Sequence, residues 1–372
     1  MAKYYIGLMS GTSADGIDLA LVEFSHSQQA TLIASHYVPY EQALTDEITS
    51  LYCPSNNEID RAHALDKKLA FKFANAIEQL LSNNSLNSND IIAIGNHGQT
   101  IRHRPASNES EITEAFTLQI GCSQTLACLT GIQVIGQFRI KDMALGGQGA
   151  PLVPAFHQFI VPQDAIDNIV VNIGGIANIS YLPKEKSGIQ GFDTGPGNCL
   201  MDEWYSLHNQ GNYDESGEWA AKGNVIPDLL ANMLKEPYFK RPAPKSTGRE
   251  VFNLNWLRQL INQHSYQAVD IQATLTTLTA ITIAHQIKQL TPKASVWLCG
   301  GGRHNQTLVK VLSSELPNMN VASTKVLGID GDALEAIAFA WLAYAYKNNI
   351  HSNIPAVTGA AKSTTLGVLF TP

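Results

Sequence analysis

Two strand–loop–strand segments about 160 residues apart constrain the fold of this 372-residue chain more than any other feature. In the first, the apolar residues 4–9 and 19–24 flank a polar turn that is rich in small residues. In the second, the apolar residues 169–172 and 177–182 flank a pair of glycines. Runs of this kind are typical of paired strands joined by a turn. Because the unit occurs twice at this long distance, it indicates two related domains.

The rest of the chain alternates between strand and helix patterns. Apolar residues recur at helical spacing over 62–80, which predicts an amphipathic helix of about six turns. Short apolar runs at 91–95, 134–136 and 295–299 predict buried strands, and residues 332–346 have the apolar face of a long helix. This mixture predicts an α/β protein.

The length of the chain is consistent with two domains, since 372 residues exceed what one small core needs. We predict an N-terminal domain of residues 1–135, completed by about 355–372, and a C-terminal domain of residues 136–354. Hydrophobic residues make up 44% of the chain and charged residues 15%, which favours a packed globular protein over a disordered one.

Charge and cysteine content exclude several classes of protein. The net charge is −7 and there is no basic stretch, so neither nucleic acid nor a membrane surface is an expected partner. The five cysteines are scattered without a C-x-x-C pair, which favours reduced thiols over disulfides or zinc. No signal peptide precedes the first strand, and the apolar run Ala336–Tyr346 is well short of the ~18–20 residues that cross a bilayer. We therefore expect a cytoplasmic protein.

The first turn is the strongest candidate for binding phosphate. Small residues allow the backbone to approach a ligand, and successive N–H groups and hydroxyls can surround phosphate oxygens. Asp15 or Asp18 can hold Mg²⁺, directly or through water. The alternative is an ordinary hairpin turn, which favours the same residue types. The predicted binding residues are Gly11, Thr12, Ser13, Ala14, Asp15, Gly16, Ile17 and Asp18.

Other glycine-rich stretches fit neither a Walker A motif nor a complete G-x-G-x-x-G motif. A nucleotide site must therefore be of another kind, built from two glycine-bearing hairpins and a strand–turn–helix unit that leaves room for adenosine at the helix start. We predict ATP as the cofactor. The residues expected to complete its site are Gly174, Gly175, Asn178, Gly300, Gly301 and Gly302.

Asp193 is the most suggestive carboxylate, in a polar turn that we expect just before a helix starting near Asn198. Phosphoryl transfer needs positioning, Mg²⁺ and a carboxylate that takes a proton from the nucleophile. An aspartate that caps the turn or the helix is the competing interpretation.

Four further side chains are candidates for binding the substrate. His97 and Gln99 follow the strand predicted at 91–95, at a position where α/β proteins bind ligands, although a structural histidine is equally consistent with the pattern. The histidine spacing does not fit a zinc site, and no protein metal ligand is assigned. Arg139 can bind an anionic group or pair with Asp142. Glu335 either faces solvent at a helix start or points into the site.

These pieces occur together in one family. Seven short sequence blocks together resemble the anhydro-N-acetylmuramic acid kinase family: residues 7–18, 96–100, 146–151, 172–178, 192–198, 245–250 and 299–302. They lie in order along nearly the whole chain, which makes the resemblance specific. Ala14 is a mild departure, since the family often carries Met there.

The resemblance implies a two-domain actin-like (ribonuclease H-like) ATPase fold with ATP in an interdomain active-site cleft. The implied activity is conversion of 1,6-anhydro-N-acetylmuramic acid to N-acetylmuramic acid 6-phosphate during peptidoglycan recycling. Asp193 matches the family's catalytic aspartate, and residues 11–18 match its first phosphate loop. Another hexosamine kinase of the same fold and a non-catalytic sugar-sensing protein are the rival interpretations. A homodimer is left open.

Overall fold

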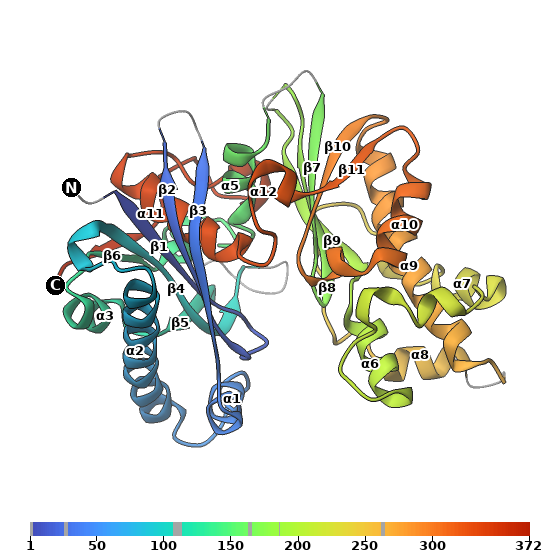
Figure 1. Cartoon of the computed structure of the whole chain (residues 1–372), viewed down its shortest axis with the longest axis horizontal. Coiled ribbons are helices and arrows are strands. Elements are labelled where there is room, and N and C mark those ends of the chain that lie inside the picture. Colours follow the sequence, from blue (N-terminus) through green and yellow to red (C-terminus); the bar gives the residue numbers. More distant parts are fainter. Residues whose placement is uncertain (1–2, 26–28, 107–113, 163–165, 186, 262–264) are drawn as a thin grey trace. The chain divides into compact units, whose positions relative to one another are not determined.

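The computed structural model describes residues 3–25, 29–106, 114–162, 166–185, 187–261 and 265–372 (Figure 1). It divides into two compact units. Unit 1 comprises Met1–Ile160 and Gly328–Pro372, and unit 2 comprises Val161–Leu327. Among the helices of the described part of the chain, none has the length and apolar character that crossing a membrane requires.

Unit 1 is built on a sheet in which the N-terminal hairpin lies beside parallel strands. Along the sheet the order is β12-β6-β4-β1-β2-β3, and β5 pairs with β4. β1 is antiparallel to β2 and parallel to β4, and β4 is parallel to β6. The strands are β1 (Tyr4–Ser10), β2 (Gly16–Phe24), β3 (Ala30–Pro39), β4 (Ile91–Arg104), β5 (Phe116–Ile120), β6 (Val134–Gly136) and β12 (Val368–Phe370).

Helices pack against this sheet, and two glycines show how closely one of them approaches. A Cβ atom on Gly7 would lie 1.7 Å from the carbonyl oxygen of Ala336, and one on Gly95 would lie 1.9 Å from that of Phe339. The backbone of α11 therefore rests directly on β1 and β4. The helices of unit 1 are α1 (Gln42–Thr49), α2 (Glu58–Asn83), α3 (Ser123–Thr130), α4 (Phe138–Ala144), α5 (Val153–Ile160), α11 (Leu334–Lys347) and α12 (Pro355–Thr358).

Unit 2 has its own sheet and its own core. The sheet order is β11-β10-β7-β8-β9, with β7 antiparallel to β8 and parallel to β10. Its strands are β7 (Asp167–Ile173), β8 (Ile176–Leu182), β9 (Gln190–Pro196), β10 (Ala294–Cys299) and β11 (Asn320–Ser323). Its helices are α6 (Cys199–His208), α7 (Pro227–Met233), α8 (Leu254–Ile261), α9 (Ala268–Leu290) and α10 (Gln306–Glu315). The long α9 is buried along most of its length, which explains its nearly continuous apolar and threonine-rich sequence.

Both units have the same strand topology. In each, three antiparallel strands formed by a hairpin and its following strand are extended on the other side of the first strand by two parallel strands. This repeated order is that of the ribonuclease H-like domain, which the actin-like fold contains twice. The α/β class and the two-domain fold predicted from the sequence are confirmed.

The limits of the two units differ from the predicted ones. The prediction assigns 136–160 and 328–354 to the C-terminal domain, whereas the structure places both segments in unit 1. The reason is packing: α11 covers β1, β2 and β4, and α5 packs on α11. Periodicity identifies these helices but does not show which sheet they cover. The return of the C-terminus is as expected, since β12 pairs with β6.

Two motifs that the sequence places outside strands lie within them. The strand predicted at 91–95 continues as β4 to Arg104, because its second half leaves β1 and pairs with β5. Gly98 allows this change, with a φ of +74° that disfavours other residues. Asp193 lies inside β9, paired with Asn178 of β8, and only Asn198 marks the helix start as predicted.

Candidate active site

The turn between β1 and β2, Gly11–Asp15, is held by its carbonyl oxygens. Four of them accept hydrogen bonds from donors elsewhere in unit 1. The donors are Gln99 Nε2 to Gly11 (3.0 Å), Tyr52 OH to Thr12 (2.8 Å), Thr45 Oγ1 to Ala14 (2.7 Å) and the Tyr40 N–H to Asp15 (2.8 Å). Three of the four lie in residues 40–52, so the segment around α1 fixes the shape of the turn.

This anchoring determines where the amide groups of the turn point. A trans peptide group is planar, so the N–H after each anchored carbonyl points the opposite way. The N–H groups of Thr12, Ser13 and Asp15 therefore face away from the side that anchors the turn. Within the described part of the chain, those of Thr12 and Ser13 have no acceptor. Amides presented in this way can bind phosphate oxygens.

Two of the residues predicted for this loop contribute only backbone. Ala14 and Ile17 are fully buried in the core of unit 1. Ala14 has a φ of +52°, a left-handed conformation that places its side chain under the turn. Their side chains belong to the core, so the backbone is the part of these two residues that is available to a ligand.

Carboxylates are concentrated next to the turn. Asp15 is exposed and Asp18 is half-buried in β2. Burial, followed by the charges of Asp15, Glu335 and Asp332, raises the pKa of Asp18 to about 6. A group of like charges of this kind favours a bound cation. Among the described residues, no cluster of three or more His, Cys, Asp or Glu side chains is arranged to hold a metal directly.

Gln99 is a structural partner of the turn. It is fully buried, and its Oε1 accepts a hydrogen bond of 2.5 Å from Ser10 Oγ, while its Nε2 donates to Gly11. Nε2 also lies 3.3 Å from Tyr52 OH. Both ends of the amide therefore contact protein groups, and the side chain connects β4 to the end of β1. Its role in binding the sugar stays a prediction.

His97 and Arg139 contact each other. His97 is 6% exposed, its Nδ1 lies 2.8 Å from the Gly98 carbonyl oxygen, and its Nε2 lies 2.9 Å from Arg139 Nη2. Arg139 Nη1 donates to the Gly149 carbonyl at 2.8 Å. Burial, followed by the charge of Arg139, lowers the pKa of His97 to about 3. The imidazole is therefore neutral.

Arg139 does not pair with Asp142, which was one of the two alternatives. The buried Asp142 carboxylate instead accepts from the Gly149 N–H, Asn353 Nδ2 and Thr358 Oγ1, each at 2.8 Å. In the described part of the chain, no acidic oxygen lies within 4.0 Å of the Arg139 guanidinium. Burial lowers the pKa of Arg139 to about 10, and the more distant Glu335 opposes this effect. Arg139 is thus a cation without a paired anion.

Glu335 occupies the first turn of α11 and its side chain is exposed, so it is accessible to a ligand as well as to solvent. The protein surrounding it raises the pKa of its carboxyl, and Arg139 opposes that rise. Because Glu335 also acts on the pKa of Asp18, the Gly11–Asp18 loop, Arg139 and Glu335 belong to one electrostatic environment in unit 1.

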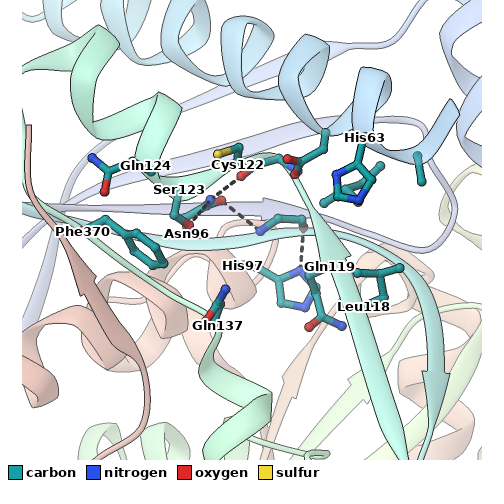
Figure 2. Close-up of a pocket in the computed structure, with 15 residues that line it drawn as sticks. His63, Asn96, His97, Leu118, Gln119, Cys122, Ser123, Gln124, Gln137 and Phe370 are labelled. Carbon is teal, nitrogen blue, oxygen red and sulfur yellow. Dashed lines mark hydrogen bonds between the residues drawn. The ribbon is translucent and has the colours of Figure 1, made fainter. Parts of the chain in front are cut away.

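A cavity of about 260 Å³ lies beside His97 in unit 1 (Figure 2). Figure 2 shows Asn96 on its wall, where its Nδ2 donates to the Gly121 carbonyl (2.9 Å) and to Ser123 Oγ (3.0 Å). Asn96 Oδ1 accepts from the Gly98 N–H at 2.9 Å. These bonds fix the backbone on which the His97 ring is mounted.

The hairpin turn of unit 2 repeats the carbonyl anchoring. The Gly174 carbonyl accepts from the Asn198 N–H at 2.7 Å, and the Gly175 carbonyl accepts from the Cys199 N–H at 3.1 Å. The N–H of Gly175 therefore points away from α6. A Cβ on Gly175 would lie 3.6 Å from an Arg249 guanidinium nitrogen, so an exposed cation lies beside this turn.

Asp193 belongs to a row of polar residues across three strands of unit 2. Asn172 of β7 pairs with Asn178 of β8, which pairs with Asp193 of β9. Residues directly opposite each other in a sheet share a face, so the three side chains form one polar surface. Asn178 thus lies beside the carboxylate as well as near the turn.

The Asp193 side chain is half-buried and held on one side. Its Oδ2 accepts from the Thr247 N–H at 3.0 Å, and its backbone carbonyl accepts from Tyr238 OH at 2.7 Å. Within the described residues, Oδ1 accepts no hydrogen bond. Burial raises the pKa of Asp193, Glu250 adds to the rise, and the Thr247 N–H opposes it. One oxygen is therefore fixed and the other is available, which is what a proton acceptor needs.

The triple-glycine turn follows β10 and packs on the same surface. A Cβ on Gly300 would lie 2.3 Å from Asn172 Oδ1, and one on Gly302 would lie 2.2 Å from Ile173 Cγ2. Gly301 differs, since its Cβ would meet only Asn198 Nδ2, at 3.7 Å. Protein atoms thus leave no room for a side chain at Gly300 and Gly302, and among the three glycines only Gly301 faces open space.

Sequence reasoning missed three residues of the site. Asn172 and Arg249 lie in blocks that carry the family resemblance, but the residues that they contact, Gly300 and Gly175 respectively, are distant from them in sequence. Tyr52 gives no local signal, because a tyrosine after a short helix has many possible roles.

Two ribonuclease H-like domains define the actin-like class of ATP-using proteins, which includes kinases that act on sugars. Comparison with known proteins identifies the family. The chain belongs to the anhydro-N-acetylmuramic acid kinase family, whose model matches residues 3–372.

Relatives described as anhydro-N-acetylmuramic acid kinase align along nearly their whole length. One from Colwellia psychrerythraea is 54% identical, covering 100% of this chain and 98% of its own, and one from Shewanella loihica is 47% identical, covering 99% and 98%. Among solved structures, the activator of the 2-hydroxyisocaproyl-CoA dehydratase from Clostridium difficile aligns with 12% identity and a TM-score of 0.42, over 92% of this chain and 97% of its own.

Proposed function

We propose that this protein uses ATP to convert 1,6-anhydro-N-acetylmuramic acid to N-acetylmuramic acid 6-phosphate and ADP, as a step in the recycling of peptidoglycan. Membership of the kinase family over residues 3–372 is the observation that carries the proposal. The geometry of Asp193, with one anchored and one available oxygen, supports its role in the reaction.

An anhydro sugar has no free 6-hydroxyl, so phosphorylation must be coupled to opening of the bridge. Asp193 accepts a proton from a water molecule, whose oxygen forms a bond to C1. The C1–O6 bond breaks, O6 bonds to the γ-phosphorus of ATP, and the bond to the β-phosphate oxygen breaks to release ADP. Asp193 can take the proton because burial raises its pKa above that of an ordinary aspartate.

The two hairpin turns are the proposed phosphate-binding elements. The outward N–H groups of Thr12, Ser13 and Asp15, and that of Gly175, would bind phosphate oxygens. Gly301 would lie beside the adenosine, because it alone of the three glycines has open space beside it. The predicted location of the active site between the two domains stays a prediction.

Mg²⁺ is proposed as the accompanying ion. The crowded carboxylates Asp15 and Asp18 fit a hard cation that prefers oxygen ligands and keeps several waters. The ion would neutralise charge on the transferred phosphoryl group. Asp18 and Asp15 would hold it through water or by one carboxylate.

Arg139 is proposed to bind the carboxylate of the lactyl group, the feature that distinguishes muramic acid from glucosamine. The guanidinium is a cation without an acidic partner within 4.0 Å in the described part of the chain, and such a group favours a carboxylate. Glu335 would hydrogen-bond a sugar hydroxyl nearby. We place the reaction in the cytoplasm, which fractionation of cells expressing the tagged protein would test.

Turnover in ¹⁸O-labelled water tests the proposal. With the anhydro sugar and ATP, rapidly quenched product should carry one heavy oxygen at C1 and none in the phosphate ester. A kinase that acts on a free hexosamine would take up no solvent oxygen beyond slow exchange at C1. Label in the ester, or a preference for free N-acetylmuramic acid over its anhydro form, would contradict the proposed reaction.

A further inference from the structure

We propose that His97 is a positioning residue: as a neutral imidazole with its proton on Nδ1, it orients the Arg139 guanidinium and thereby sets the preference for a substrate that bears a carboxylate. This inference rests on the proposed function, since it assigns His97 a role in substrate selection that acts through Arg139.

Two partners of the His97 ring nitrogens determine its tautomer. The Ser10 backbone also interacts with the ring and raises its pKa, but burial and the charge of Arg139 outweigh this effect. The Gly98 carbonyl oxygen, 2.8 Å from Nδ1, can only accept a hydrogen bond, so Nδ1 donates. Arg139 Nη2, 2.9 Å from Nε2, can only donate, so Nε2 accepts. A histidine with one donor and one acceptor nitrogen is neutral. An imidazolium would place a second positive charge against the guanidinium.

The ring itself is held rigidly. It packs on Phe339 of α11 with ring centroids 4.6 Å apart. Asn96 bridges the Gly98 N–H to Gly121 and Ser123, so the carbonyl that selects the tautomer belongs to a backbone fixed on both sides. Figure 2 shows these bonds around the His97 ring.

Arg139 is held at two points and left unpaired elsewhere. His97 binds Nη2 and the Gly149 carbonyl binds Nη1, while the Gly149 N–H is itself fixed by the buried Asp142 carboxylate. Arg139 Nε is buried and has no hydrogen-bond partner among the described residues. Neutral acceptors thus fix the plane of the guanidinium without neutralising its charge, so the charge stays available for a ligand.

This arrangement explains why a histidine is suited to the position. An aspartate or glutamate would bind Arg139 more strongly but would cancel its charge. A neutral acceptor orients the cation at a smaller cost to its affinity for an anion. Arg139 can then present its remaining N–H groups to a carboxylate in one geometry.

The experiment compares two substrates: 1,6-anhydro-N-acetylmuramic acid and 1,6-anhydro-N-acetylglucosamine, which lacks the lactyl carboxylate. The readout is the ratio of kcat/KM for the two sugars. We expect His97→Leu to lower this ratio by about 10- to 100-fold, because an acceptor on a charged donor is lost, with KM for ATP unchanged. His97→Gln, whose amide oxygen can accept near the Nε2 position, should restore much of the ratio.

A double-mutant cycle separates positioning from a structural effect. If His97 acts through Arg139, then His97→Leu combined with Arg139→Ala should have the same substrate ratio as Arg139→Ala alone. His157→Leu is the matched control, because His157 is also a buried histidine of unit 1, in α5, and should leave the ratio unchanged. Additive losses in the cycle, or an unchanged ratio in a folded His97→Leu variant, would overturn the inference.

A measurement on the unaltered protein covers the case in which the leucine variant does not fold. Nitrogen NMR of the His97 ring at neutral pH should show a proton on Nδ1 and an accepting Nε2. A proton on Nε2 would overturn the inference. Failure of the wild-type protein to convert the anhydro sugar would instead reject the proposed function, so the two failures are distinguishable.

Discussion

The two sheets have the same topology but carry different chemistry at equivalent positions. In unit 1, Asp18 of β2 pairs with Met9 of β1 and Tyr37 of β3. In unit 2, the equivalent row is Asn172, Asn178 and Asp193. The first sheet therefore places a carboxylate on its second strand, next to the phosphate turn, and the second sheet places one on its third strand.

The turns of the two hairpins differ as well. The turn Gly11–Asp15 of unit 1 is wide and needs side-chain donors from residues 40–52 to fix it. The turn Gly174–Gly175 of unit 2 is short and is fixed by the backbone at the start of α6. A repeated fold thus supplies two turns with outward-pointing amide groups. The carboxylates lie on different strands of the two sheets, which supports the proposed division between a cation site in unit 1 and proton transfer in unit 2.

Removing the carboxylate of the second sheet should have the largest effect. We expect Asp193→Asn to lower kcat by about 10²–10⁴-fold, the range typical of losing a general base, while ATP still binds. Calorimetric titration with a nonhydrolysable ATP analogue would measure that binding. Asp167→Asn, at the opposite end of the same sheet, is the control and should retain activity. Near-normal turnover by a folded Asp193→Asn protein would remove Asp193 from the mechanism.

The hairpins and the strands around them could be predicted from the sequence, because each is a local pattern of apolar residues and small turn residues. The continuation of β4 past residue 95 could not, since it depends on distant partners: Gln99 bonds to Ser10, and Asn96 bonds to Gly121. Without knowledge of those partners, the polar sequence of this part of the strand is typical of a loop.

Only part of the candidate site could be predicted, because the rest also depends on contacts between residues that are distant in sequence. The glycines and aspartates of the turns can be recognised from local composition, whereas the pairing of residues across strands cannot. Asp193 was expected in a turn because its neighbours are Gly, Thr and Pro, yet it lies in β9 opposite Asn178. Arg139 had two possible partners in sequence, and only the fold shows that Asp142 is occupied by Gly149, Asn353 and Thr358.

The triple-glycine turn Gly300–Gly302 belongs to unit 2 alone. Substitutions in this turn therefore test whether unit 2 binds the adenosine of ATP. Gly301→Val should raise KM for ATP by about 10-fold or more, because the added side chain would fill space beside Asn198 that the adenosine is proposed to occupy. Its Tm should change little. Gly300→Ala is the contrasting variant: with a φ of +74° and Asn172 Oδ1 only 2.3 Å from the new Cβ, it should lower the Tm. An unchanged KM in Gly301→Val would place the adenosine elsewhere.

We expect the ionised carboxylate of Asp18, in the first sheet, to lower the stability of the folded protein while it supports activity. Burial, together with the neighbouring carboxylates, raises the pKa of Asp18 to about 6, so its ionised form is disfavoured in the folded state. The sign follows: ionised Asp18 costs stability above pH 6, and that cost disappears as the pH falls from 6 toward 4. Asp18→Asn should therefore raise the Tm by a few degrees at pH 7 and have little effect at pH 4.

The same variant should weaken the response to Mg²⁺. We expect Asp18→Asn to raise the Mg²⁺ concentration needed for half-maximal activity by about 10-fold, because one oxygen charge near the ion is lost. Wild-type activity should also require more Mg²⁺ as the pH falls through 6 and Asp18 becomes protonated. An unchanged Mg²⁺ dependence would mean that the carboxylates of unit 1 do not hold the ion.

The smallest expected effect concerns the side-chain donors that only the first turn needs. Tyr52 OH is the donor to the Thr12 carbonyl among the described residues, and the same carbonyl faces opposite to the Ser13 N–H. Tyr52→Phe should let this peptide group rotate and raise KM for ATP by about 2- to 10-fold, the range expected from one neutral hydrogen bond. Tyr37→Phe is the matched control: Tyr37 OH donates to the Asp15 carbonyl at 3.0 Å, but that carbonyl keeps the Tyr40 N–H at 2.8 Å. Its KM should therefore stay near that of the wild type. Equal changes in the two variants would show that the turn is not held through individual carbonyls, and the contrast drawn here between a side-chain-anchored turn and a backbone-anchored turn would fail.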